Sequence, residues 1–117
     1  ERGDNMQALV IVLNQTEKLE KLLMNFAAKG ITGGTLIDSK GMAKELYSKH
    51  KDLPMFGTLS MLLNESRPLN KTIFLVLDDE KVEVAKQVVR ETLEDISKKG
   101  VGIMFTVPVT SVEGLNN

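Results

Sequence analysis

Four lysines gather around one glutamate near the middle of the chain, and their types and spacing suit the binding of an anion. Lys40, Lys44, Lys49 and Lys51 surround Glu45. Ammonium groups attract anions, so this cluster predicts a locally positive face, although a lysine-rich loop is more often simply solvated. Lys40 and Lys44 are therefore candidate ligand-binding residues.

Other chemistries find little support in the residues. Cysteine is absent, which excludes disulfides, thiolate metal sites and a cysteine nucleophile, and His50 is the only histidine. A metal site at His50 would need carboxylates or neighbouring subunits, so we expect a surface histidine and no metal. The acidic run 78–80 suits a helix N-terminus without a bound cation. No nucleophile stands in a recognisable spacing with a base, so we expect no catalytic residue and no enzyme.

Length and composition predict one ordinary globular domain. The chain has 117 residues, 42% of them hydrophobic, with a formal net charge of -1. This charge favours neither nucleic acid nor a membrane surface as partner. The longest apolar run, residues 8–13, is too short to cross a membrane, so we expect a cytoplasmic protein with no membrane insertion. The domain is expected to span residues 6–117, with residues 1–5 as a disordered or extraneous start.

Two segments of similar pattern flank the middle of the chain, and each is predicted to form a strand, a helix and a second strand. In the first, the apolar run 8–13 is followed by Asn14 and Glu17, a pair typical of a helix cap, and the helix is expected to end at Gly30. The next strand is expected over 31–37, where two glycines indicate a bulge or a close backbone approach. The second segment repeats this order, with strands at 72–77 and 101–109 and a helix between them that ends near Gly100.

Tandem βαβ units predict an α+β ferredoxin-like sandwich, in which two helices cover one face of a four-stranded antiparallel sheet. The first strand of each unit is central in this fold, and these two strands are apolar at consecutive positions. Successive strand residues point to opposite faces, so the face without helices must also be apolar. An exposed patch of this kind predicts a homo-oligomer packed sheet to sheet.

A long insert, residues 39–70, separates the two units. Residues 41–51 and 54–64 each have the pattern of a short amphipathic helix, and Pro54 suits a first helical turn. The many apolar residues of the second half favour packing on the body or on a neighbouring subunit. For the first half, packing and a binding loop remain equal alternatives.

Several short motifs resemble the PII nitrogen-regulatory signalling family. The run 30–33 followed by 40–42 is similar to that family's helix exit and loop entry, and Lys98, Gly100, Gly102 and Phe105 resemble its glycine-containing loop and last strand. The likeness extends from about Met6 to Val109. It implies a homotrimer with inward-facing sheets and nucleotide sites in the clefts between subunits. It also implies a central loop that controls a partner protein, a transporter or an enzyme, in nitrogen regulation.

The resemblance also implies site residues and a cofactor. Six residues match positions near the family's adenine-nucleotide site, which implies ATP or ADP: Thr32, Gly41, Met42, Lys98, Gly100 and Gly102. Glycines there would let backbone N–H groups approach phosphate, although Gly100 and Gly102 could equally cap a helix and start a strand.

The chain also departs from that family's pattern. Ile103 replaces a phosphate-contacting lysine, and the tail segment 111–114 lacks the family's basic pair. The sequence therefore predicts a divergent regulatory protein that senses a small anionic or nucleotide ligand, a different ligand or none. The alternatives are a metal-binding trimer of the CutA type and a structural subunit that has lost ligand binding.

Overall fold

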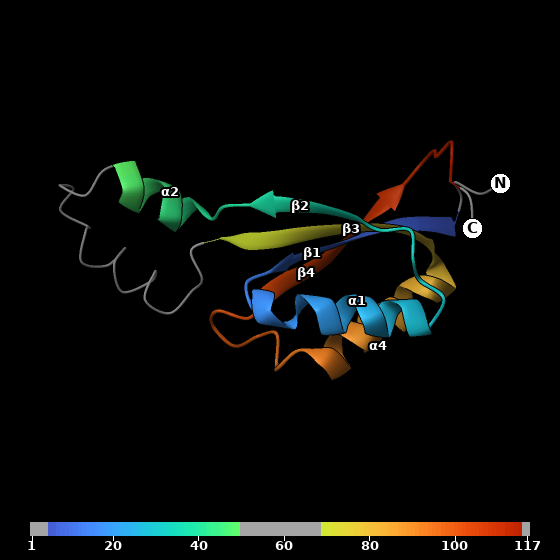
Figure 1. Cartoon of the computed structure of the whole chain (residues 1–117). Coiled ribbons are helices and arrows are strands. Elements are labelled where there is room, and N and C mark those ends of the chain that lie inside the picture. The colour runs from blue at the N-terminus through green and yellow to red at the C-terminus, as the bar shows by residue number, and fades with distance from the viewer. Residues whose placement is uncertain (1–4, 50–68, 116–117) are drawn as a thin grey trace.

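The computed structural model describes residues 5–49 and 69–115, and Figure 1 shows how their helices and strands are arranged. The elements follow in the order β1 (Met6–Leu13), the 3-10 turn η2 (Thr16–Lys18), α1 (Leu19–Ala28), β2 (Thr35–Ser39), α2 (Met42–Lys49), β3 (Asn70–Asp78), α4 (Asp79–Thr92) and β4 (Gly102–Val109). The expected helix at 54–64, together with His50 and residues 1–4, lies outside the described residues.

The four strands form one antiparallel sheet in the order β2-β3-β1-β4. The two apolar strands, β1 and β3, are central, as the sequence predicts. Both α1 and α4 lie on the same face of the sheet (Figure 1). The α+β ferredoxin-like sandwich is therefore confirmed, with the insert between its two halves.

The hydrophobic core lies between the sheet and the two helices. Alternate residues of β1 point into it, and Leu9, Ile11 and Leu13 have no exposed surface. Because β1 pairs with both neighbours, Ile11 stands level with Ile73 on one side and Met104 on the other. Burial of these aliphatic side chains away from water supplies most of the stabilisation of such a fold.

The start of the first helix differs from the prediction. Asn14 does not cap it; its backbone N–H donates to the Val101 carbonyl oxygen at 3.0 Å, which ties the end of β1 to the turn before β4. The chain then makes the 3-10 turn η2, and α1 begins at Leu19 without a side-chain cap. The helix ends as expected, with Gly30 at a φ of 80°.

Two further element boundaries differ from the prediction. β2 begins at Thr35 rather than residue 31, and Gly34 passes so close to β3 that an added Cβ would lie 2.7 Å from Leu75 Cδ2. Gly34 therefore marks a close approach, one of the two alternatives that the sequence left open, whereas a Cβ added to Gly33 would meet no atom within 4 Å. α4 ends at Thr92, because Leu93 turns into an extended conformation with a ψ of 163°.

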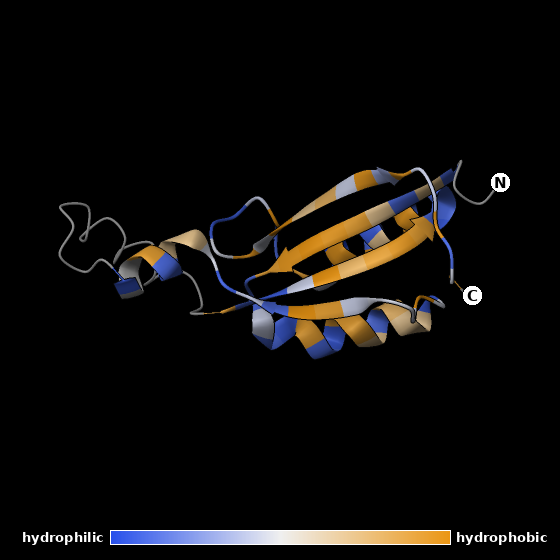
Figure 2. Cartoon of the chain, turned by 90° about the horizontal axis from the view of Figure 1, so that it is seen from above, coloured by the Kyte–Doolittle hydropathy of each residue, from blue (hydrophilic) through white to orange (hydrophobic). Residues whose placement is uncertain are grey.

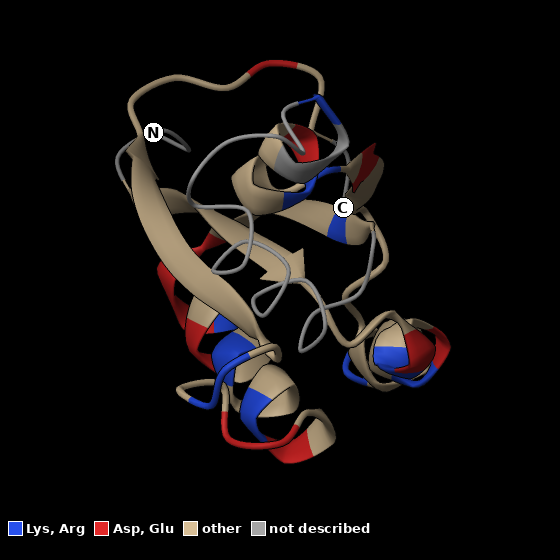
Figure 3. Cartoon of the chain, turned by 90° about the vertical axis from the view of Figure 1, so that its left-hand side faces the viewer, with Lys and Arg blue, Asp and Glu red and all other residues tan. Residues whose placement is uncertain are grey.

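The face of the sheet opposite the helices carries exposed apolar side chains. In Figure 2 the strands are orange over much of their length, and because successive residues face opposite sides, such strands are apolar on both faces. The charged residues gather mainly on the helices and connections (Figure 3). We call this surface the free face; its exposed members are Ile37, Phe74, Ile103, Phe105 and Val107.

The helices of the described part of the chain give no sign of a membrane-spanning segment, since none is both long and apolar enough to cross a bilayer.

Candidate functional site

The predicted ligand-binding residues lie in three separate places. Thr32 precedes β2, and the group Lys40, Gly41, Met42 and Lys44 follows it. Lys98 and Gly100 precede β4, which begins at Gly102. The end of β2 and the start of β4 lie at the same end of the sheet but on its opposite edges. With strands about 4.8 Å apart, three strand spacings place the two groups roughly 14 Å apart.

The entry to the insert is held at the end of the sheet. Ser39 is level with Asn70, and its hydroxyl contacts the Asn70 side chain and, at 2.8 Å, the Thr72 hydroxyl. Lys71 forms an ion pair with Asp38 one residue further in. These contacts hold the last residues of β2 against β3, and they thereby position Lys40 and Gly41, which follow directly.

Two ion pairs connect the residues that follow β2. Lys40 Nζ lies 2.8 Å from Glu45 Oε1, and Lys49 Nζ lies 3.2 Å from Glu45 Oε2. Hydrogen bonds from Lys40 and then Lys49, together with their charges, lower the pKa of Glu45. Glu45 thus neutralises part of the positive charge that the sequence predicts as an attraction for an anion. Met42 is 79% exposed, so it does not pack on the described body of the protein.

The turn before β4 has its own internal support. The Asp95 carboxylate accepts hydrogen bonds from the Ser97 N–H at 3.0 Å and from the Ser97 hydroxyl at 2.7 Å. The Lys98 N–H donates to the Asp95 carbonyl oxygen at 2.9 Å. Gly100 has a φ of 85°, a left-handed conformation that favours glycine. It stands in a turn rather than at the end of a helix, which corrects the expected capping role.

Acidification is expected to release the Asp95 turn. The Ser97 hydroxyl and then the Ser97 N–H lower the pKa of Asp95 below its ordinary value of 3.8. A carboxyl group with a lowered folded pKa stabilises the folded loop above the unfolded pKa, and this contribution is lost as the pH falls through the folded pKa. We expect the Ser97 amide proton shift to titrate with a midpoint below 3.8, and the Asp95→Asn variant to lack this titration. A midpoint at or above that value in the unmodified protein would contradict the assignment.

Thr32 lines a cavity of about 450 Å³ at the other end of β2. The cavity lies between the α1–β2 connection, the last residues of β3, the first turn of α4 and the C-terminal segment. Gly30, Val76, Asp78, Lys81 and Leu115 are among its other lining residues. The structure therefore joins Thr32 to groups that are far apart in sequence, rather than to the other predicted site residues.

The sequence prediction missed Asp78 and Lys81 as members of a site. Asp78 caps α4, with its Oδ1 accepting the Lys81 N–H at 2.9 Å, and the sequence accounts for the acidic run by capping alone. Lys81 Nζ donates to the Lys29 carbonyl oxygen at 3.2 Å, at the C-terminal end of α1. The i, i+3 spacing of an acid and a base in a first helical turn was the available signal, and it does not by itself indicate a cavity.

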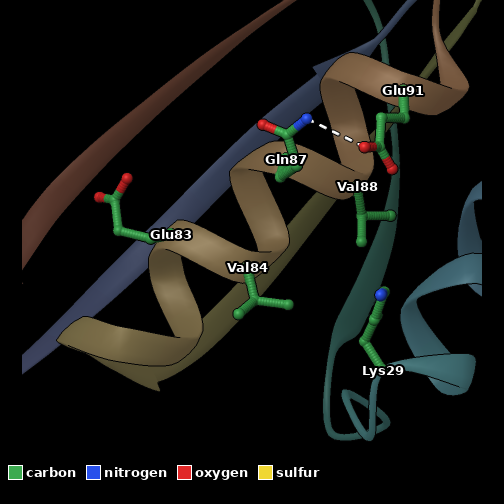
Figure 4. A pocket seen from close by; sticks show the side chains of 6 residues that line it. All are labelled: Lys29, Glu83, Val84, Gln87, Val88 and Glu91. Carbon is green, nitrogen blue, oxygen red and sulfur yellow. Dashed lines mark hydrogen bonds between the residues drawn. The ribbon is translucent and has the colours of Figure 1, made fainter.

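A further hollow of about 340 Å³ lies beside α4, on the side that faces Lys29 at the end of α1 (Figure 4). Its floor is formed by Val84 and Val88, with Lys29 on the α1 side and a hydrogen bond from Gln87 to Glu91 along its rim. None of the predicted ligand-binding residues lines it. Within residues 5–49 and 69–115, no group of three or more His, Asp or Glu side chains is placed to hold a metal ion.

Comparison with known proteins identifies the fold. No protein-family model and no curated protein matches the sequence. Among solved structures, the PII protein of Arabidopsis thaliana bound to citrate has a TM-score of 0.61 at 15% identity, over 91% of this chain and 78% of that one. A functionally unknown protein from Pediococcus pentosaceus has a TM-score of 0.61 at 10% identity, over 95% and 98% of the two chains. The chain therefore has a PII-like fold.

Proposed function

We propose that this protein is a PII-like regulatory protein rather than an enzyme. In this proposal it assembles as a homotrimer, binds a small anionic or nucleotide ligand in the clefts between subunits, and controls a protein target through residues 39–70. The observation that carries the proposal is the free face, which supplies a hydrophobic surface for sheet-to-sheet assembly. The PII-like fold supports the same arrangement.

The separation of the two basic groups supports a site shared between subunits. Lys40 and Lys44 lie at the β2 edge, and Lys98 lies near the β4 edge, with the two central strands between them. When sheets pack against one another, the β2 edge of one subunit can approach the β4 edge of its neighbour. Lysine ammonium groups and the N–H groups beside Gly100 and Gly102 would then meet an anion from both sides.

An anion is the ligand class that these groups fit best. The similar PII of Arabidopsis thaliana was solved with citrate, a small carboxylate, bound to it. Ile103 is the second residue of β4 and has an exposed, uncharged side chain. We therefore expect weaker contacts to a triphosphate than a lysine at this position would provide, and we propose carboxylates beside ATP and ADP as ligands.

Calorimetry tests the ligand directly. Citrate, ATP, ADP, cyclic nucleotides and bicarbonate are titrated into the protein at micromolar concentration. We expect saturable binding of at least one of them, weakened about tenfold in a Lys98→Ala variant, because one charge-assisted contact contributes about 1.5 kcal/mol or more. Absence of binding by all five would contradict the ligand-sensing role.

A mixing experiment tests whether the ligand site is shared. Lys44→Ala and Lys98→Ala subunits are unfolded together and refolded in equal amounts. If each cleft takes Lys44 from one subunit and Lys98 from the next, random assortment restores about a quarter of the sites. A site within one chain would restore none, so a mixture that binds no better than either variant alone would contradict the shared cleft.

A further inference from the structure

A second hollow adjoins the Thr32 cavity and is almost entirely apolar. It has a volume of about 260 Å³ and lies beneath β2, between α1 and the sheet. Phe26, Ile31, Leu36 and Ile73 are among its lining residues, and Thr32 is its one polar side chain. The two hollows share the lining residues Ile31, Thr32 and Leu75, so they are neighbours, one with polar and charged lining residues and the other apolar.

The larger, more polar hollow carries one acid and one base that are not paired with each other. Asp78 uses one carboxylate oxygen to accept the Lys81 backbone N–H, and Lys81 Nζ donates to the Lys29 carbonyl oxygen. A carboxylate can accept about four hydrogen bonds, and an ammonium group can donate three. Both groups therefore keep capacity for a ligand. Lys81 Nζ lies 3.3 Å from the position of a Cβ added to Gly30, which places the ammonium beside the chain that leads into the apolar hollow.

The backbone of β3 adds hydrogen-bonding capacity in the same hollow. Pairing with β2 ends where Thr35 meets Phe74, so the next residues of β3 have no β2 partner. Three of these residues, Leu75, Val76 and Leu77, line the larger cavity. A polar molecule there would have strand N–H and carbonyl groups within reach as well as the two charges.

We propose that the two adjoining hollows bind a free amino acid with a branched aliphatic or aromatic side chain. Asp78 pairs with its ammonium group, Lys81 pairs with its carboxylate, and the side chain enters the apolar hollow past Thr32. Volumes of 450 and 260 Å³ together lie in the range of small-molecule sites. This site lies within one chain, so it stands or falls independently of the shared anion cleft, although it also uses Thr32.

Three partial ligands separate the contributions of the two charges and the side chain. 4-Methylpentanoate keeps the carboxylate and the branched chain of leucine but lacks the ammonium group, isopentylamine lacks the carboxylate, and glycine lacks the side chain. We expect L-leucine and L-phenylalanine to bind at least tenfold more tightly than each of the three in calorimetry, because one well-placed charge or apolar group contributes about that factor.

Asp78→Asn is the sharpest variant because asparagine caps helices as well as aspartate does, so the fold is preserved while the charge is removed. We expect it to weaken L-leucine binding at least tenfold and to leave 4-methylpentanoate binding unchanged. Leu36→Gln is expected to weaken leucine binding but to leave glycine binding unchanged. Glu83→Gln, on the outer side of α4, is the matched control and should bind leucine as the unmodified protein does. Circular dichroism checks that all three variants are folded.

Leucine that binds no more tightly than glycine, or an Asp78→Asn variant with unchanged leucine affinity, would overturn the proposal. Binding of citrate or a nucleotide with no heat from any amino acid would overturn it too, while leaving the anion-sensing function in place. Binding of leucine that is lost in Asp78→Asn would support it whether or not the anions bind.

Discussion

A Phe105→Asp variant is expected to be a folded monomer at micromolar concentration. Phe105 lies on the free face and is 45% exposed in the single chain, so aspartate there meets water in the monomer. The weak strand propensity of aspartate costs the fold only about 1 kcal/mol. In a sheet-to-sheet trimer the same carboxylate would be buried against apolar side chains, which costs several kcal/mol per copy unless it is paired.

Light scattering measures this result as a fall in mass from three chains to one. Val84→Asp provides the matched control, because Val84 has a similar exposure of 38% but lies on α4, on the other side of the molecule. We expect this control to retain the mass of the unmodified protein. A Phe105→Asp protein that is folded and still has that mass would place the assembly interface elsewhere.

A Gly102→Ala variant is expected to lose roughly 3 kcal/mol of folding free energy, because a strained backbone conformation and a forced contact act together. Gly102 has a φ of 155°, and an added Cβ would lie 2.6 Å from the Val12 carbonyl oxygen in the neighbouring strand. That atom belongs to the backbone of the central strand β1 and cannot move aside as a side chain would. Urea unfolding monitored by circular dichroism measures the loss.

Gly33→Ala is the control for this substitution. No atom lies within 4 Å of the Cβ that it would add, so we expect a change within about 0.5 kcal/mol. A Gly102→Ala protein that is as stable as the unmodified protein and binds ligand equally well would contradict this prediction. It would mean that the start of β4 is packed less closely against Val12 than the structure shows. If Gly102→Ala is destabilised as expected, the glycine is required by the fold, and its presence alone does not indicate phosphate binding.

Local patterns were sufficient to predict the architecture. Consecutive apolar residues in β1 and β3 indicate strands that are buried at both alternating positions, and only the centre of the sheet provides such places. The same pattern predicts the free face, because Phe74 on β3 points away from the helices while its neighbours Ile73 and Leu75 point towards them.

Element ends depend on contacts between distant segments, which the sequence does not reveal. Asn14 has the right type to cap a helix, yet its backbone is held by Val101, and the helix starts later. Ile31 is a residue type common in strands and is buried. However, Gly34 brings the chain against Leu75 before β2 begins to pair with β3. In both places a long-range contact outweighs the local preference.

The site was predictable only in part, for the same reason. Residue types identify Lys40 and Lys98 as basic groups near sheet ends, but only the strand order places them on opposite edges. The Thr32 cavity joins Gly30, Lys81 and Leu115, which are far apart along the chain. No spacing in the sequence indicates that these residues meet.

The most direct test of the proposed PII-like regulatory protein is the mass of the unmodified chain in solution. Sedimentation equilibrium or light scattering at micromolar concentration measures it without any label or variant. We expect the mass of three 12.9-kDa chains, because an exposed apolar face of this kind favours association with other copies. A clean monomer at this concentration would contradict both the trimer and the ligand clefts between its subunits.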